Sequence, residues 1–197
     1  MANFNLMFTL CTQKLKLAAL VIIGMMSSTP SINAGGSMLI DDFSATPEKR
    51  WSYVADTVMG GVSTGSISFE DEAGTYFVRL TGDVSTENNG GFIQVRKRLP
   101  EAFPAKSVGL RLVVRGNGES YFVFLRSRLA TRPWHSYRAK FATSGEWAAT
   151  DLPLDEFTRS HSALPEDILP GDVTGIGIVA YGADYEADIS VAEISLY

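Results

Sequence analysis

The feature that most constrains the fold is a series of short apolar or alternating runs between Met38 and Tyr197. Clusters of Gly, Asn, Asp and Pro separate these runs, a pattern typical of strands joined by turns. No heptads, internal repeats or long helical periods occur. The sequence therefore predicts an all-β fold, a jelly-roll β-sandwich of about ten or eleven strands. The expected strands span residues 38–43, 51–54, 65–69, 76–80, 91–99, 108–115, 120–126, 134–141, 147–152, 173–180 and 188–196.

The two-residue alternation also predicts which side chains point into the sandwich. In the run 91–99, we expect Ile93 and Val95 on one face, and Phe92, Arg96 and Arg98 on the other. In the run 134–141, the face that carries Tyr137 is expected to be buried. The run 120–126 is apolar nearly throughout, which predicts a central strand that is covered on both faces.

The first 40 residues have the organisation of a leader. They contain no Asp or Glu, and Lys14 and Lys16 precede an apolar run that is followed by small residues up to Ala34. This order is typical of a secretory signal peptide. We expect residues 1–34 to be a signal peptide or an N-terminal anchor, and residues 38–197 to form one exported domain, periplasmic or envelope-associated in a bacterium. A mitochondrial presequence is less expected, because such segments usually carry Arg and the first one here is Arg50.

Cysteine content and charge exclude several function classes. Cys11 is the only cysteine and lies in the leader, so the expected domain has no disulfide, cysteine zinc site or thiol nucleophile. Acidic residues outnumber basic ones by 22 to 17, which together with export argues against a nucleic-acid partner. Segment 96–140 is rich in Lys and Arg, whereas segment 141–197 is rich in Asp and Glu. Either these segments neutralise each other on adjacent strands, or the first forms a basic face for an anionic partner.

Candidates for catalysis are few. His135 and His161 belong to no recognisable triad or metalloprotease motif. Neighbouring carboxylates such as Asp41 and Asp42 would point to opposite sides of a strand, so a solvated face explains them better than an acid–base pair. We therefore expect no catalytic residue, no cofactor and no metal, and a non-enzymatic protein. A calcium ion near residues 184–188 is a weaker alternative that rests on oxygen-rich composition.

Two segments combine a strand with glycine-rich turn chemistry: WSYVADTVMGGVS at 51–63 and GDVSTENNGGFIQVR at 82–96. In the first, Asp56 and Thr57 can hydrogen-bond to nearby backbone, while Gly60 and Gly61 permit positive φ angles. Asn and Gly at positions 88–91 have the same properties in the second. The two loops are either plain connections or two lips of one recognition surface.

Both segments resemble the signature segments of the NADH:ubiquinone oxidoreductase complex I intermediate-associated protein 30 (CIA30) family. The resemblance extends from about Leu39 to Tyr197. It implies a galactose-binding-like β-sandwich, related in shape to carbohydrate-binding modules. It also implies a chaperone-like assembly factor whose partners are proteins, such as membrane-complex subunits or assembly intermediates. The mitochondrial members assemble respiratory complex I, whereas the leader of this chain indicates export.

The resemblance implies a binding surface on the two loops. Its candidate residues are Asp56, Thr57, Met59, Gly60, Gly61, Ser63, Glu87, Asn88, Asn89, Gly90, Gly91 and Arg96. For protein binding we expect a partly apolar patch around Val58 and Met59, because a flexible thioether suits an adaptable interface. The alternative function is an exported carbohydrate-binding module. It predicts an aromatic platform of Trp51, Trp134 and Tyr137, assisted by Arg126.

Overall fold

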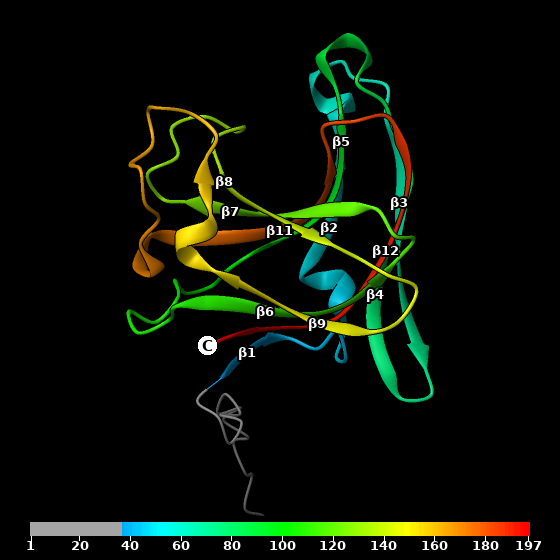
Figure 1. Ribbon diagram of the computed structural model, residues 1–197, viewed down its shortest axis with the longest axis horizontal. Coiled ribbons are helices and arrows are strands. Elements are labelled where there is room, and N and C mark those ends of the chain that lie inside the picture. Colours follow the sequence, from blue (N-terminus) through cyan, green and yellow to red (C-terminus); the bar gives the residue numbers. More distant parts are fainter. Residues whose placement is uncertain (1–36) are drawn as a thin grey trace, which may run out of the picture.

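The computed structural model describes residues 37–197, which fold into two antiparallel sheets that pack face to face (Figure 1). The predicted leader, residues 1–34, lies outside the described residues. Short 3₁₀ turns connect some of the strands. They are η1 (Pro47–Lys49), η2 (Asp56–Met59), η3 (Glu87–Asn89), η4 (Leu154–Glu156) and η5 (Pro170–Asp172).

The first sheet has the strand order β3-β4-β12-β6-β9, and β1 also pairs with β12. Its strands are β1 (Met38–Asp41), β3 (Thr64–Glu72), β4 (Thr75–Val84), β6 (Gly109–Gly116), β9 (Ala148–Pro153) and β12 (Tyr185–Leu196). The second sheet has the order β10-β8-β7-β11-β5-β2. Its strands are β2 (Trp51–Ala55), β5 (Phe92–Arg98), β7 (Ser120–Ser127), β8 (Tyr137–Ala142), β10 (Thr158–Arg159) and β11 (Val173–Tyr181).

The predicted fold class is confirmed. Each of the eleven predicted runs corresponds to an observed strand, and runs 65–69 and 76–80 form the expected hairpin β3–β4. Within residues 37–197, the one observed strand that was not predicted is β10, which has only two residues. A run that short carries no readable alternation, so its pairing with β8 depends on tertiary structure.

The core lies between the inner faces of the two sheets. Ile93 and Val95 on β5 are fully buried, as their alternation predicts, and Tyr137 on β8 is also buried. Fully burying a side chain of this size stabilises a fold by about 1.5–3 kcal/mol, so this double layer of apolar side chains dominates the stability. The prediction for run 120–126 was wrong in one respect. Phe122 and Phe124 lie on the outer face of β7 and remain partly exposed.

Asp41, at the end of β1, connects the two sheets through a buried carboxylate. Its side chain accepts hydrogen bonds from the Arg50 guanidinium at 2.7 and 3.1 Å and from the Trp51 indole at 2.9 Å. The Lys97 ammonium on β5 also pairs with it. Burial alone would raise the pKa of Asp41, but the hydrogen bonds from Arg50, Lys97 and Trp51 lower that pKa from 3.8 to about 2. The carboxylate therefore stays charged inside the fold.

We predict that Asp41→Asn lowers the free energy of unfolding by about 3 kcal/mol, because it leaves the nearly buried Lys97 without a counter-charge. The pKa of Asp41 is depressed in the folded state. Its stabilisation is therefore present above the unfolded pKa of about 4 and is lost as pH falls toward 2. Urea unfolding across this range should show the difference between wild type and variant shrinking on acidification.

The matched control is Asp42→Asn. Asp42 is exposed and, among residues 37–197, accepts hydrogen bonds only from the nearby Ser44, so this variant should remain within about 0.5 kcal/mol of wild type. Equal effects of the two substitutions would contradict the role assigned to Asp41.

Candidate functional site

The two signature segments lie side by side because β2 and β5 are neighbours in the second sheet. Trp51 pairs with Lys97, and Ala55 pairs with Ile93. The loop that follows β2 and the loop that precedes β5 therefore meet at one end of the sandwich, at the top of Figure 1. We call residues 56–63 and 85–91 together the tip. The β11–β12 connection joins it, since the Gly182 N–H donates to the Gly91 carbonyl at 2.9 Å.

The carboxylate of Asp56 lies at the centre of the tip, and its residue is 0% exposed. One oxygen, Oδ1, accepts the backbone N–H of Ser63 at 3.0 Å. The other, Oδ2, accepts the Ser63 hydroxyl at 2.5 Å, the Gly91 N–H at 2.6 Å and the Phe92 N–H at 3.2 Å. Burial alone would raise the pKa of Asp56, but these donors hold it below its ordinary value. The carboxylate thus ties one loop to the other across 35 residues of sequence.

The glycines of both segments fit around this carboxylate. A Cβ atom at Gly61 would lie 2.3 Å from Cγ of Asp56, and a Cβ atom at Gly90 would lie 2.5 Å from its Oδ2. Both approaches are far closer than real Cβ contacts allow. Gly60 differs, because its space is open and its φ of +91° is what favours glycine there. Glycine is therefore required for two different reasons: Gly61 and Gly90 leave room for the Asp56 carboxylate, and Gly60 adopts a positive φ angle.

The structure divides the candidate binding residues into two groups. Asp56, Ser63 and Gly91 are buried, so they build the tip rather than contact a ligand. The exposed members are Thr57, Met59, Gly60, Glu87, Asn88 and Asn89, and Gly61 and Gly90 are partly exposed. Arg96 lies further along β5 on the outer face of the second sheet, and no described hydrogen bond joins it to the tip.

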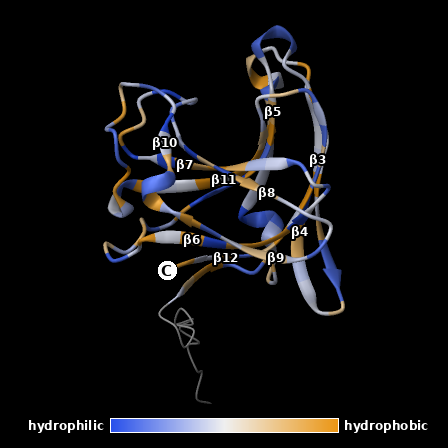
Figure 2. Ribbon diagram, in the orientation of Figure 1, coloured by the Kyte–Doolittle hydropathy of each residue, from blue (hydrophilic) through white to orange (hydrophobic). Residues whose placement is uncertain are grey.

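Three large apolar side chains are exposed at the tip. Val58 is 72% exposed, Met59 53% and Val62 41%, and Figure 2 shows hydrophobic colouring at this end of the ribbon. The sequence indicated Val58 and Met59 but not Val62. In the sequence, Val62 was marked only by its place in a glycine-rich turn. That place does not show whether its side chain is buried or exposed.

The predicted aromatic platform does not form. Trp51 and Tyr137 are buried, and their polar atoms bond to the Asp41 carboxylate and the Pro165 carbonyl. They are therefore not available to a surface ligand. Trp134 is 53% exposed. Arg126 is partly exposed on the outer face of β7, where its guanidinium donates to the carbonyls of Pro133 and Arg132.

A different aromatic cluster, which the sequence did not reveal, lies on the outer face of the second sheet. Phe122, Phe124 and Tyr181 meet edge to face with ring centroids 5.3–6.1 Å apart. The Arg138 guanidinium lies 4.6 Å from the centroid of Phe124 and 4.7 Å from that of Tyr181, and it donates to the Tyr181 hydroxyl at 2.9 Å. The apolar run of β7 concealed these positions, because outer and inner phenylalanines look alike in sequence.

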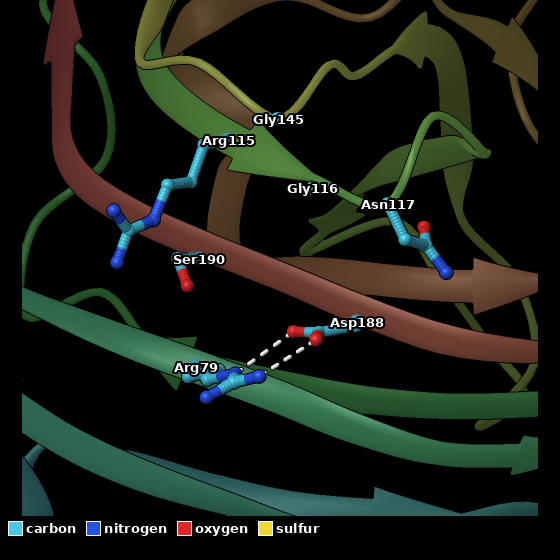
Figure 3. A pocket seen from close by; sticks show the side chains of 7 residues that line it. All are labelled: Arg79, Arg115, Gly116, Asn117, Gly145, Asp188 and Ser190. Atoms are coloured by element: carbon cyan, nitrogen blue, oxygen red, sulfur yellow. Dashed lines mark hydrogen bonds and ion pairs between the residues drawn. The ribbon is translucent and has the colours of Figure 1, made fainter.

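The first sheet carries a polar hollow of about 260 Å³ on its outer side (Figure 3). Its charges are already paired. Arg79 donates two hydrogen bonds to Asp188, at 2.8 and 2.7 Å, and Arg115 pairs with Glu72 at 2.7 Å. The hollow therefore offers no charge that needs an external partner.

The histidines come together without forming a catalytic pair. The rings of His135 and His161 stack with centroids 4.8 Å apart, and within residues 37–197 no carboxylate bonds to either of them. Burial, followed by the charges of His161, Arg126 and Arg132, lowers the pKa of His135. This disfavours the imidazolium form.

The described residues contain no group of three or more His, Cys, Asp or Glu side chains that could hold a metal ion. At the calcium site considered from sequence, Asp184 accepts from the N–H and hydroxyl of Thr86, and Asp188 pairs with Arg79. Among residues 37–197, no helix has the length and apolar character needed to cross a bilayer.

The two sheets and their connections define a jelly-roll β-sandwich of the galactose-binding-like class. The sequence model of the complex I intermediate-associated protein 30 (CIA30) family matches residues 42–190. The chain therefore belongs to this family. The match includes both loops of the tip. A comparison with curated protein sequences found no match.

Several solved structures share the fold. The family 11 carbohydrate-binding module of cellulosomal cellulase Lic26A-Cel5E of Clostridium thermocellum is 14% identical, with a TM-score of 0.67 over 82% of this chain and 94% of that chain. A family 30 carbohydrate-binding module is 13% identical, with a TM-score of 0.51 over 70% of this chain and 91% of its own. The agarase AgWH50C is 8% identical, with a TM-score of 0.53 over 81% of this chain but only 24% of the agarase. At these identities the likeness shows the fold alone.

We predict that Asp56→Asn destabilises the tip by about 1–3 kcal/mol, because one amide cannot accept all the hydrogen bonds that both carboxylate oxygens accept. Hydrogen exchange should accelerate at the amides of Ser63, Gly91 and Phe92 while the strands of the first sheet stay protected. In wild type the pKa of Asp56 is depressed, so the same amides should lose protection as pH falls below the ordinary range of Asp. Unchanged exchange at all three amides would contradict the role of the carboxylate.

We predict that Gly61→Ala and Gly90→Ala each destabilise the protein by about 1–3 kcal/mol, because the added methyl group would overlap the Asp56 carboxylate. Gly145→Ala is the matched control. Its site is open and its φ is not positive, so the change should stay within about 0.5 kcal/mol. Thermal unfolding of the three variants provides the comparison, and similar losses in all three would argue against the fit around Asp56.

Proposed function

We propose that this chain is a non-catalytic protein-binding module that acts as an assembly factor, and that the tip is its docking surface. The observation that carries the proposal is the joint exposure of Val58, Met59 and Val62 on loops held by the buried Asp56. Clustered exposed apolar side chains commonly mark interaction sites. A rigid loop also loses less conformational entropy when it binds, so more of the contact energy appears as affinity.

The family description supports a protein as the partner. It names association with an intermediate of complex I, a multi-protein assembly. For this chain we propose a subunit or assembly intermediate of an envelope complex, because the sequence of the leader indicates export. Met59 suits such a role, since its flexible side chain can adapt to the differing surfaces of assembly intermediates.

Carbohydrate binding is the second candidate function. Two of the structures that share the fold are named as carbohydrate-binding modules, and Trp134 offers a partly exposed ring with the Arg132 guanidinium 5.9 Å from its centroid. Sugar rings stack on exposed aromatic faces. However, Trp51 and Tyr137 are buried, so only one ring of the predicted platform remains at the surface.

We predict that Val58→Ser combined with Met59→Ser reduces partner capture at least about ten-fold while leaving thermal unfolding unchanged, because both side chains point into solvent. The experiment is affinity capture from the native envelope fraction, quantified by mass spectrometry. Val108→Ser is the matched control. It removes an apolar side chain of similar exposure from a different loop, so it should retain the partners.

A glycan array run with the same proteins tests the second candidate. A reproducible glycan signal that Trp134→Ala abolishes, with no protein captured by wild type, would overturn the protein-binding proposal. Full capture by the double serine variant would show instead that the tip is not the docking surface.

A further inference from the structure

The second sheet has an unusual charge distribution. Its six strands contain no acidic residue and seven basic ones. The basic residues are Arg96, Lys97, Arg98, Arg126, Arg138, Lys140 and Arg159. The strands of the first sheet show the reverse balance, with three arginines among nine acidic residues. Positive charge is therefore concentrated on one layer of the sandwich.

The two sheets also differ in whether their arginines are paired. In the first sheet, Arg79, Arg111 and Arg115 each form an ion pair with a carboxylate at 2.6–2.7 Å. In the second sheet, Lys97 pairs with the buried Asp41. Among residues 37–197, no other basic side chain of the second sheet forms an ion pair. The basic residues of segment 96–140 that lie in the first sheet, Arg111 and Arg115, are thus paired with carboxylates, whereas among residues 37–197 only Lys97 of those in the second sheet is.

The unpaired guanidinium groups occupy neighbouring rows on the outer face. Arg96 on β5 pairs with Gly177 on β11, Gly177 pairs with Phe124 on β7, and Phe124 pairs with Arg138 on β8. In the next row, Gly175 separates Arg98 from Arg126. Strands lie about 4.8 Å apart, so the row from Arg96 to Arg138 spans about 14 Å. The two glycines contribute no side chain of their own between the arginines, and the Gln94 side chain lies over Gly177, where its Oε1 would be 2.9 Å from an added Cβ atom.

The chemistry of this face requires a ligand that accepts hydrogen bonds. Arginine donates and cannot accept, and it binds carboxylates through two parallel hydrogen bonds. Burial, followed by the positive charge of Arg96, lowers the pKa of Arg126, as expected of a guanidinium near like charge without a counter-ion. The first 36 residues contain no Asp or Glu, so they cannot supply the missing carboxylates.

The aromatic cluster favours a peptide over a sugar. A sugar ring stacks on an open aromatic face, whereas Arg138 already lies over Phe124 and Tyr181 and the rings meet each other edge to face. Sugar hydroxyls also need acceptors, and the strands of this sheet provide no carboxylate. In an extended peptide, residues four apart lie about 13 Å from one another on one face, which matches the row from Arg96 to Arg138.

We propose that the outer face of the second sheet binds an extended, acidic segment of the protein partner. Arg96, Arg126 and Arg138 pair with its carboxylates, and Phe122 contacts an intervening apolar side chain. This inference rests on the proposed protein-binding function, but it concerns a surface separate from the tip. Its test therefore uses a peptide that does not need the tip.

The probe is the heptapeptide acetyl-Glu-Ser-Phe-Ser-Glu-Ser-Glu-amide, in which every Glu and the Phe share one face of the extended chain, titrated into the full chain by calorimetry. The matched probe has Gln in place of every Glu and should bind at least about ten-fold more weakly. Affinity for the acidic peptide should fall as salt is raised. Arg96→Gln with Arg138→Gln should weaken binding at least about ten-fold, whereas Arg79→Gln with Arg111→Gln removes the same charge from the first sheet and should leave it unchanged.

Three results would overturn the inference. They are no binding of the acidic peptide at about 1 mM and low salt, equal loss in both double variants, and binding of an oligogalacturonate in place of the peptide. The Val58→Ser, Met59→Ser variant separates the two proposals. If this variant binds the peptide normally but captures fewer partners, both proposals are supported. If wild type does not bind the peptide but still captures partners through the tip, only the inference about the second sheet is overturned.

Discussion

Two buried carboxylates hold the edge strand β2 at both of its ends, and the candidate site depends on this constraint. At the start of β2, the indole of Trp51 donates to Asp41, which also pairs with Lys97 from the neighbouring strand. Directly after β2, Asp56 accepts the N–H groups of Gly91 and of Phe92, the first residue of β5. An edge strand lacks a partner on one side and is easily displaced. Because a charged side chain fixes each end of β2, the loop that follows it has a defined position.

The fold could be predicted from sequence because a two-residue alternation is local information. Ile93 and Val95 could be assigned inward from five or six residues of context. The tip could be predicted only in part. The glycines at 60, 61, 90 and 91 were visible as turn chemistry, but the reason for Gly61 and Gly90 is the carboxylate of Asp56. That contact depends on the pairing register of β2 with β5, which no local pattern contains.

Aromatic residues were the least predictable part of the candidate site. Trp51 and Tyr137 each have a polar atom, which suits a surface position beside a loop, but a buried partner can satisfy that atom equally well. Phe122 and Phe124 present the opposite case, since their apolar run is typical of a core strand although both lie on the outer face. Charge was similarly ambiguous. The acid-rich segment 141–197 supplies β9 and β12 to the first sheet, whereas its strand β11 carries no acid into the second.

The two proposed surfaces adjoin each other through the backbone. Phe92 opens β5 immediately after the tip and pairs with Tyr181 at the end of β11, and the next residue, Gly182, bonds to Gly91. One partner can therefore contact both the apolar tip and the arginine-bearing face. Apolar contacts supply most of the affinity in such an arrangement, while complementary charge accelerates association and fixes orientation. Because the tip is held by Asp56 and the arginines project from a sheet, neither surface needs to fold on binding. Selectivity among partners then depends on where a partner's carboxylates lie relative to that partner's apolar patch.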